Sequence, residues 1–126
     1  MKVNLVEIKA LDFAIRIVKL QEYLTDLTAK DHKKEFVMSK QILRSGTSIG
    51  ANISEATAAE SIDDFIHKLA ISQKEAHETR FWLKLLYMTE YINEKMYLSM
   101  LNDCEQLIKM LVKIIKTSKQ NDQKQS

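Results

Sequence analysis

One row of polar residues in this sequence has types and spacing that suit chemistry. The row follows the three- and four-residue steps of a single helix face and consists of Gln41, Arg44, Ser48, Asn52 and Glu55. Arginine can hold a carboxylate or a phosphate through two parallel hydrogen bonds. Ser48 and Asn52 are poor helix formers, whereas a solvated face usually has lysine, glutamate or glutamine. The row is predicted either to be a solvated face or to pair with a neighbour. In the second case Arg44 would meet Glu75 or Glu78, or an external carboxylate or phosphate.

A second candidate site combines an aromatic residue with cations. Trp82 stands between Arg80 and Lys84 in the run R-F-W-L-K. An aromatic ring beside cations can stack on a nucleotide base or anchor a protein interface. The alternative is that Trp82 wedges against the following helix, because Phe81 and Trp82 cannot both belong to a core that contains Leu83.

A basic stripe lies near the C-terminus of the chain. It recurs at helical steps and consists of Lys109, Lys113, Lys116 and Lys119. Cations in this position stabilise the C-terminal end of a helix whatever else they do. The stripe is a candidate surface for nucleic acid, but it does not by itself indicate one.

Patterns for catalysis or metal binding are sparse. A ferritin-like di-metal site needs two Glu-x-x-His motifs and further carboxylates, and only Asp64-x-x-His67 has a comparable spacing. Cys104 lies on an apolar stripe with no histidine near it in the sequence, which indicates a buried structural thiol. We therefore expect no enzyme activity, no metal and no cofactor. A metal enzyme that uses Asp64 and His67 is the alternative.

Composition favours a single helical domain. The chain has 126 residues, of which 45% are apolar and 29% charged, with no proline and only two glycines. Folds with many tight turns use more of both residues, so an all-α fold is expected. The formal net charge of +2 argues against nucleic-acid binding by bulk charge.

The sequence also predicts a cytoplasmic location. No run of about 18 apolar residues is present to span a membrane. Glu7 and Lys9 interrupt the N-terminal stretch, which therefore does not resemble a secretion signal. The single Cys104 cannot form an internal disulfide, which suits a reducing compartment.

Apolar periodicity predicts four helices, over about residues 4–27, 35–57, 61–90 and from 93 onward. Ser61 and Asn93 are suitable N-caps for the last two. Short links between the helices then give an antiparallel up-down-up-down four-helix bundle over residues 1–118. A polar C-terminal tail, residues 119–126, follows, and the chain is expected to fray from Thr117. Small residues such as Gly46 in the second helix and Ala76 in the third should let neighbouring helices approach closely.

Two of the predicted helices have more apolar residues than one packing seam uses. The extra residues of the first helix are Ile8, Leu11, Ile15 and Val18, and those of the last are Met100, Leu107, Met110 and Ile114. Exposed apolar area beyond a few hundred Å² usually marks an interface. Self-association is therefore expected, as a dimer or as a closed ring.

Two segments of the chain resemble a known family. They are Q-I-L-R-S-G-T-S-I-G-A-N-I-S-E-A, residues 41–56, and D-D-F-I-H-K-L-A-I-S-Q-K-E-A-H-E-T-R-F-W-L, residues 63–83. Together they resemble the four-helix-bundle family that is encoded in intervening sequences of 23S ribosomal RNA genes. The resemblance extends from about Leu5 to Ile115. Many members of that family have proline where Gly50 stands and glycine where Ala56 stands.

The resemblance implies a bundle that assembles as a homopentamer, with no catalytic activity. It also implies kinship with the accessory variability protein of diversity-generating retroelements, a basic pentameric barrel that binds a reverse transcriptase and nucleic acid. The strong positive charge of that protein is missing here. Our first hypothesis is therefore a homo-oligomeric scaffold for RNA, DNA or a nucleic-acid-handling protein. The second is a protein–protein interaction adaptor that binds no nucleic acid.

Overall fold

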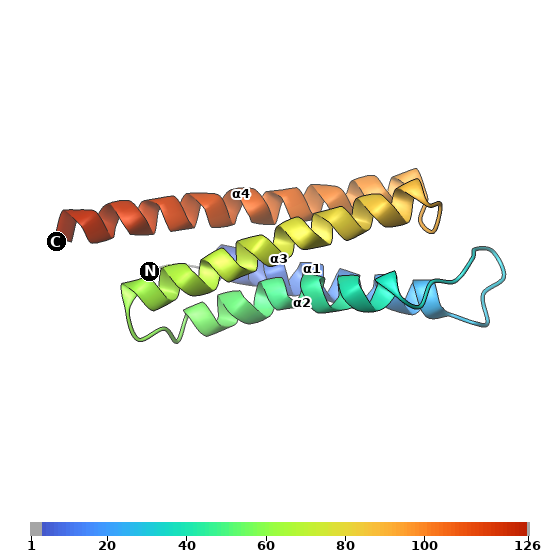
Figure 1. The fold of residues 1–126 in the computed structure, drawn as a ribbon, viewed down its shortest axis with the longest axis horizontal. Helices are drawn as coiled ribbons and strands as arrows, with labels where there is room; N and C mark the ends of the chain where they lie inside the picture. The colour runs from blue at the N-terminus through green and yellow to red at the C-terminus, as the bar shows by residue number, and fades with distance from the viewer. Residues whose placement is uncertain (1–3, 126) are drawn as a thin grey trace.

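The computed structural model describes residues 4–125, which form an antiparallel four-helix bundle (Figure 1). The helices are α1 (Asn4–Thr25), α2 (Met38–Ala56), α3 (Ile62–Met88) and α4 (Glu94–Gln125). Each helix reverses the direction of the one before it, so the predicted all-α, up-down-up-down architecture is confirmed. None of the helices within residues 4–125 combines the length and hydropathy needed to cross a membrane.

Two of the helix starts follow the sequence prediction. The hydroxyl of Ser61 accepts a hydrogen bond from the backbone N–H of Asp64 at 3.1 Å. The side-chain carbonyl of Asn93 accepts one from the N–H of Met96 at 2.9 Å. Each bond satisfies a donor that the first turn of a helix leaves without an intrahelical acceptor. The N-caps of α3 and α4 are therefore those predicted.

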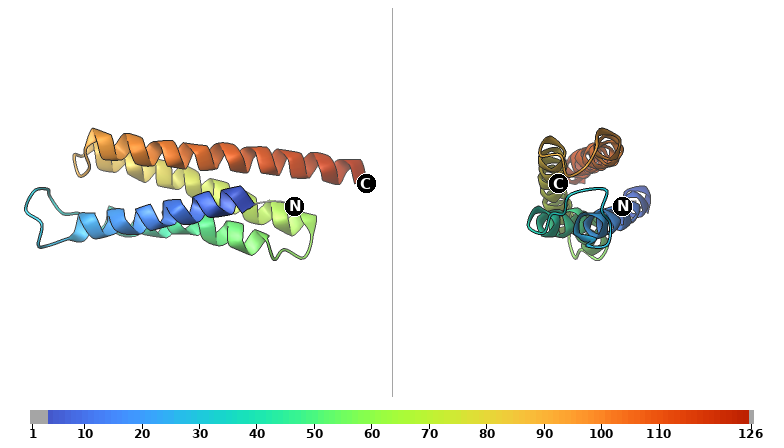
Figure 2. Two further views of the ribbon diagram at one scale, coloured as in Figure 1. Left: turned by 180° about the vertical axis from the view of Figure 1, so that it is seen from behind. Right: turned by 90° about the vertical axis from the view of Figure 1, so that its right-hand side faces the viewer.

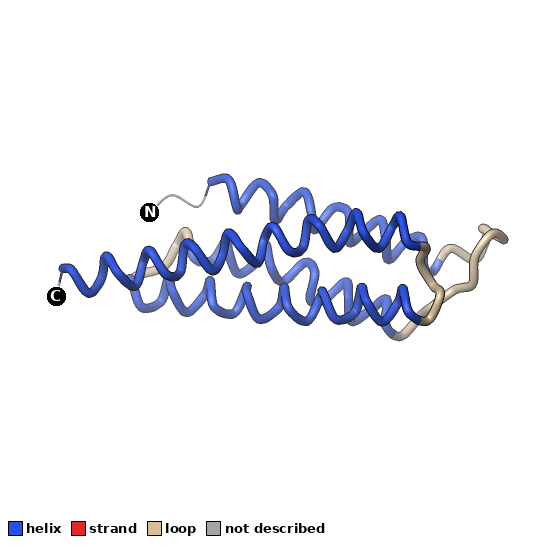
Figure 3. The backbone as a smooth tube through the Cα atoms, turned by 90° about the horizontal axis from the view of Figure 1, so that it is seen from above, coloured by secondary structure: helices blue, strands red, loops and turns tan. Residues whose placement is uncertain are grey.

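The connection between α1 and α2 is longer than expected, because α2 begins at Met38 instead of near Glu35 (Figure 3). Glu35 is only 7% exposed and acts as a cap instead of a helical residue. Its carboxylate accepts hydrogen bonds from the N–H groups of Val37 at 3.1 Å and Ser39 at 2.9 Å. Its own N–H donates to the carbonyl of Leu24 in α1 at 2.9 Å. Glu35 therefore joins the end of α1 to the start of α2.

The core consists of the apolar stripes predicted from the sequence. The stripe predicted for the first helix ran from Val6 to Leu27, and its members from Val6 to Leu24 are buried. Leu27 was wrongly included: α1 ends at Thr25, so Leu27 lies beyond the helix and is 78% exposed. The stripe of α3, from Phe65 to Leu86, is buried throughout, including its polar members Ser72 and Thr79. These stripes face one another along the bundle axis, as helix packing in a bundle requires.

Helix α4 differs from the prediction in two ways. It continues to Gln125, through the polar residues that were expected to fray. No proline or glycine interrupts this segment, and Ser118 is buried, so packing reaches beyond Thr117. In addition, Met100 and Leu107 are buried, and Met110 and Ile114 pack against the core. The extra apolar row of α4 is therefore used inside the bundle, because α4 contacts both α3 and α1.

The two glycines of α2 face α1. A Cβ atom added to Gly46 would lie 2.7 Å from Cγ1 of Ile17, closer than such atoms approach in proteins. One added to Gly50 would lie 3.6 Å from the backbone and side chain of Ala10, an ordinary contact. The glycines therefore allow α1 and α2 to lie close together, and only Gly46 is required by the packing.

Small residues also join α2 to α3, as the sequence suggested. The buried hydroxyl of Ser72 donates to the carbonyl of Ile49 at 2.8 Å. The buried hydroxyl of Thr79 lies 2.9 Å from that of Ser45 and also donates to its own helix. Side chains this short can be hydrogen-bonded across the interface without holding the helices apart.

Candidate functional site

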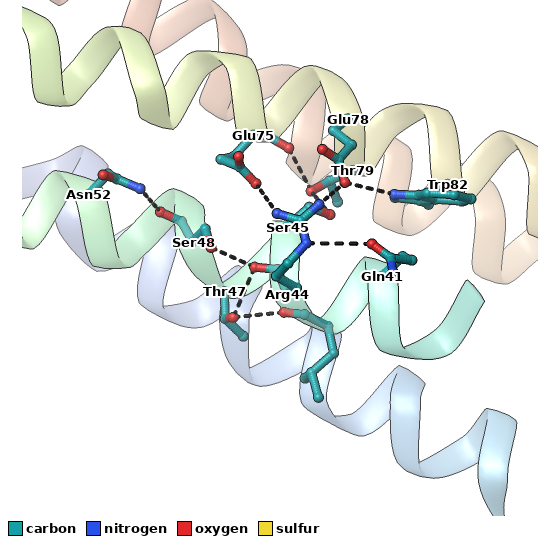
Figure 4. A network of polar contacts seen from close by, with 11 residues as sticks. Gln41, Arg44, Ser45, Thr47, Ser48, Asn52, Glu75, Glu78, Thr79 and Trp82 are labelled. Atoms are coloured by element: carbon teal, nitrogen blue, oxygen red, sulfur yellow. Dashed lines mark hydrogen bonds and ion pairs between the residues drawn. The ribbon is translucent and has the colours of Figure 1, made fainter. Parts of the chain in front are cut away.

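The predicted polar row of α2 lies at the junction with α3, with Arg44 at its centre (Figure 4). Nη1 of Arg44 lies 3.0 Å from Oε2 of Glu75, and Nη2 contacts Oε2 of Glu78. Nε of Arg44 donates to Oε1 of Gln41 at 3.5 Å. Arg44 therefore pairs with both carboxylates that the sequence offered as its partners. Glu75 and Glu78 lie one helical turn apart on α3.

Trp82 completes this cluster. Its indole N–H donates to Oε2 of Glu78 at 3.0 Å, so one carboxylate oxygen accepts from both Trp82 and Arg44. The Trp82 ring is partly buried against the core. Trp82 therefore belongs to the α2–α3 junction, and the prediction that it wedges against the following helix is not what the structure shows.

The rest of the row is also satisfied within the molecule. The hydroxyl of Ser48 donates to the carbonyl of Arg44 at 2.7 Å, and the amide of Asn52 donates to the carbonyl of Ser48 at 2.8 Å. Nζ of Lys68 in α3 lies 3.0 Å from Oε1 of Glu55. Of the two alternatives predicted for the row, the structure favours pairing, and the partner is α3.

The electrostatics of the cluster do not suit an external anion. Arg44 brings one positive charge, and Glu75 and Glu78 bring two negative charges. A phosphate at this position would have to displace a carboxylate that already holds the guanidinium. The cluster has no hydroxyl or thiol nucleophile beside a base. Its evident role is to join two helices.

The run from Arg80 to Lys84 does not form one site. Successive side chains are about 100° apart around a helix, so residues two positions apart point to nearly opposite sides. Trp82 points toward α2, whereas Arg80 points toward α4, where Nη1 lies 3.9 Å from Oε2 of Glu105. The expectation that Trp82 lies between two cations is therefore wrong.

The aromatic residue that lies with Arg80 and Lys84 is Phe81. Its side chain is 57% exposed and contacts the edge of Trp82. These three residues line an open groove of about 390 Å³ between α3 and α4, which Tyr97 and Leu101 complete from α4. Sequence reasoning missed Phe81 because two adjacent aromatic residues left open which of them the core would take. The three-residue step from Phe81 to Lys84 was the available signal.

The basic stripe lies on the outside of α4. All four of its lysines, Lys109, Lys113, Lys116 and Lys119, are exposed. They extend over about three turns of helix α4. Only Lys119 lies in the segment that was expected to fray. The stripe is accessible to an anionic partner.

The remaining candidates for chemistry are inert or incomplete. The Cys104 thiol is buried and donates to the carbonyl of Ala76 at 3.3 Å. Burial raises the pKa of this thiol to about 12, so it is protonated and unreactive at neutral pH. Asp64 and His67 have no third histidine, cysteine or carboxylate near enough to complete a metal site in the part of the chain that the structure describes.

The most distinctive surface is apolar. Five large side chains on the outside of α1 are between 41% and 62% exposed; they are Leu5, Ile8, Leu11, Ile15 and Val18, called here the α1 apolar row. Ile8 and Leu11 also border an open groove of about 620 Å³ between α1 and α2. Small residues, including Ala14, Gly50 and Ala51, also line this groove. Four of these five residues are the extra row predicted for the first helix, and the bundle leaves them uncovered.

Sequence comparison places this chain in a family. Residues 4–113 match the family model of the 23S rRNA-intervening sequence protein. The chain belongs to the 23S rRNA-intervening sequence protein family. This membership confirms the resemblance seen in residues 41–56 and 63–83, and the matched span includes α1, α2, α3 and most of α4.

A solved structure has the same fold. It is the 1.70 Å crystal structure of a protein of unknown function from the S23 ribosomal protein family of Bacteroides thetaiotaomicron. The two sequences are 56% identical, the match covers 88% of this chain and 98% of the other, and the TM-score is 0.82. No curated protein matches this chain. The comparisons therefore support the family and the fold of this chain, and they name no activity for it.

Proposed function

We propose that this protein is a non-enzymatic scaffold built from several copies of the chain, five in number. In this proposal the assembly holds RNA, DNA or a protein that handles nucleic acid. Five is the number that the resemblance to the family implies. The observation that carries the proposal is the α1 apolar row, which the bundle leaves exposed.

The size of the α1 apolar row argues for a partner. Residues 5–18 extend over roughly 20 Å of helix at about 1.5 Å per residue. Each Å² of apolar surface removed from water contributes about 25 cal/mol, so large side chains that stay exposed forgo stabilisation. The neighbouring groove is lined in part by small residues, including Gly50 and Ala51, which leave room for a helix. A second copy of the chain is the partner always present.

The nucleic-acid part of the proposal is supported by the exposed basic stripe on α4. Phosphates attract such lysines through charge and release counterions on binding. The net charge of only +2 argues against binding of nucleic acid through the overall charge of the protein. That value favours the second candidate function, an adaptor that binds proteins alone.

Sedimentation velocity at micromolar concentration tests the scaffold. The wild-type chain is expected to have a mass that is a multiple of its 14.6 kDa. The variant Ile15→Asp places a charge in the α1 apolar row and should sediment as a monomer. Lys30→Asp, at an exposed position in the connection between α1 and α2, is the matched control and should keep the wild-type mass. A wild-type monomer would overturn the proposal.

A salt titration separates the two candidate functions. The probe is a fluorescent single-stranded RNA of mixed sequence, with binding followed by anisotropy. Contacts to phosphates predict an affinity that falls steeply as salt rises, and a shallower slope for the double variant Lys109→Glu/Lys113→Glu. Absence of binding at low salt favours the adaptor.

A further inference from the structure

We propose that copies of this chain associate head to tail, with the α1 apolar row of one copy packed against the α3–α4 groove of the next. The inference rests on the proposed self-association and specifies which two surfaces meet. It follows from a second exposed apolar patch, its position on the bundle, and the charges around both patches.

The second patch borders the groove between α3 and α4. Its exposed members are Phe81 and Met88 on α3 and Leu98 on α4, called here the α3–α4 patch. Helical spacing places Met88 on the face of Phe81 and Lys84, and it places Leu98 on the face of Leu101 and Glu105, which line the groove. The bundle therefore has two separate uncovered apolar surfaces.

The two surfaces lie on opposite sides of the bundle. α1 packs on α2 and α4, and α3 also packs on α2 and α4, so α1 and α3 are diagonal. The groove beside the α1 apolar row is completed by α2, whereas the second groove is formed by α3 and α4. The end-on view shows these two helix pairs on opposite sides (right panel of Figure 2).

This arrangement favours unlike surfaces in contact. A two-fold dimer places one patch against its own copy and leaves the other patch in water. A head-to-tail contact buries one surface of each kind at every interface, and a closed ring leaves neither exposed. Only the second arrangement covers both apolar surfaces of every copy.

Charge also favours this pairing. Glu7 is the charged residue that lines the α1–α2 groove, and Glu22 is exposed one turn beyond Val18. On the other surface, Arg80 pairs with Glu105, whereas Lys84 has no ion-pair partner within residues 4–125. The lysines of α1, Lys9 and Lys19, line grooves on its α4 side. An acidic border thus meets a basic one, and two α3–α4 patches facing each other would oppose their lysines.

The two surfaces are similar in length. The α1 apolar row covers residues 5–18, roughly 20 Å, and the α3 part of the second surface covers residues 77–88, roughly 17 Å, at about 1.5 Å per residue. The α1 apolar row can therefore lie along the α3–α4 groove over nearly its full length.

The test uses one variant for each surface, Ile15→Asp and Phe81→Asp, with mass measured by sedimentation velocity. Each variant alone lacks one of the two surfaces and is expected to be a monomer. In an equimolar mixture, the intact α1 row of the Phe81→Asp chain can pack on the intact groove of the Ile15→Asp chain. The mixture is therefore expected to form two-chain complexes that grow no further.

Several results would overturn this inference. Phe81→Asp keeping the wild-type mass, or a mixture that stays monomeric, would contradict head-to-tail contact even if the wild-type chain is oligomeric. A wild-type monomer would instead overturn the proposed scaffold. Circular dichroism checks folding, and the pair Leu11→Lys and Leu98→Lys replaces any variant that does not fold. Lys30→Asp should keep the wild-type mass throughout.

Discussion

Nη1 of Arg44 in α2 lies 3.0 Å from Oε2 of Glu75 in α3, and this contact shows what the polar row of α2 does. The Glu75 side chain is only 15% exposed, so its charge requires a partner more than a surface carboxylate does. Arg44 supplies that partner from the neighbouring helix and also contacts Glu78. The residues that looked most like a binding site are thus an internal connection between two helices.

Replacing Arg44 should destabilise the bundle. Arg44→Ala leaves two neighbouring carboxylates unpaired, and we expect a loss of about 1 kcal/mol, because the Arg44 side chain is half exposed and screened by water. The double variant Arg44→Ala/Glu75→Gln should regain part of the loss. Lys68→Ala, which breaks the more exposed pair with Glu55, should cost less. Urea unfolding at one fixed protein concentration measures all three, and an Arg44→Ala effect no larger than that of Lys68→Ala would contradict this assignment.

The two glycines of α2 should respond oppositely to alanine. Gly46→Ala places a methyl group 2.7 Å from Cγ1 of Ile17 and should lower the free energy of unfolding. Gly50→Ala meets only ordinary contacts and should raise it by up to about 1 kcal/mol through helix propensity. Thermal unfolding compares the two variants with the wild type. In the double variant Gly46→Ala/Ile17→Ala the clash is removed, so it should lose less stability than the two single changes combined.

Glu35 should contribute to stability as a cap. Glu35→Ala removes the acceptor for the N–H groups of Val37 and Ser39, and we expect a loss of about 1–2 kcal/mol. Glu35→Gln keeps one carbonyl acceptor and should lose less. Urea unfolding measures both variants, with Lys30→Ala in the same connection as an exposed control. Equal stability of Glu35→Ala and the wild type would disprove the capping role.

Cys104 should make the bundle less stable at high pH. Burial raises the pKa of its thiol from 9.0 to about 12, so between these values the unfolded chain has lost the proton and the folded chain keeps it. The free energy of unfolding attributable to this residue should therefore fall as pH rises above 9, at up to about 1.4 kcal/mol per pH unit. The difference in stability between the wild type and Cys104→Ala, followed from pH 7 to pH 10.5, isolates this contribution from the lysines and tyrosines. A difference that does not change with pH would contradict it.

Much of the architecture could be predicted because it depends on short-range patterns. The buried stripes of α1 and α3 follow a periodicity visible in the sequence, and the caps Ser61 and Asn93 act within their own first turns. The pairing of Arg44 with Glu75 and Glu78 was also foreseeable, because adjacent helices in a bundle run alongside each other. Patterns of this kind need no knowledge of the final packing.

The features that were missed depend on how the helices finally pack. Glu35 is a residue type usually found at the surface, and its capping role depends on the path of residues 26–37. The choice between Phe81 and Trp82 depends on how far α3 is rotated about its axis. The burial of Met100 and Leu107 depends on α4 reaching α1 across the bundle. Of these features only the grouping of Phe81 with Lys84 had a local signal, their three-residue step.

If another copy covers the α1 apolar row, a thiol placed in this row should be protected from labelling. In a chain that also contains Cys104→Ala, the single thiol introduced by Ile15→Cys is exposed in one isolated bundle. We expect slow labelling at micromolar concentration and faster labelling as the protein is diluted, whereas the thiol of a matched Lys30→Cys chain reacts rapidly at every concentration. Rapid, concentration-independent labelling at position 15 would show that the row faces water and that no second copy covers it.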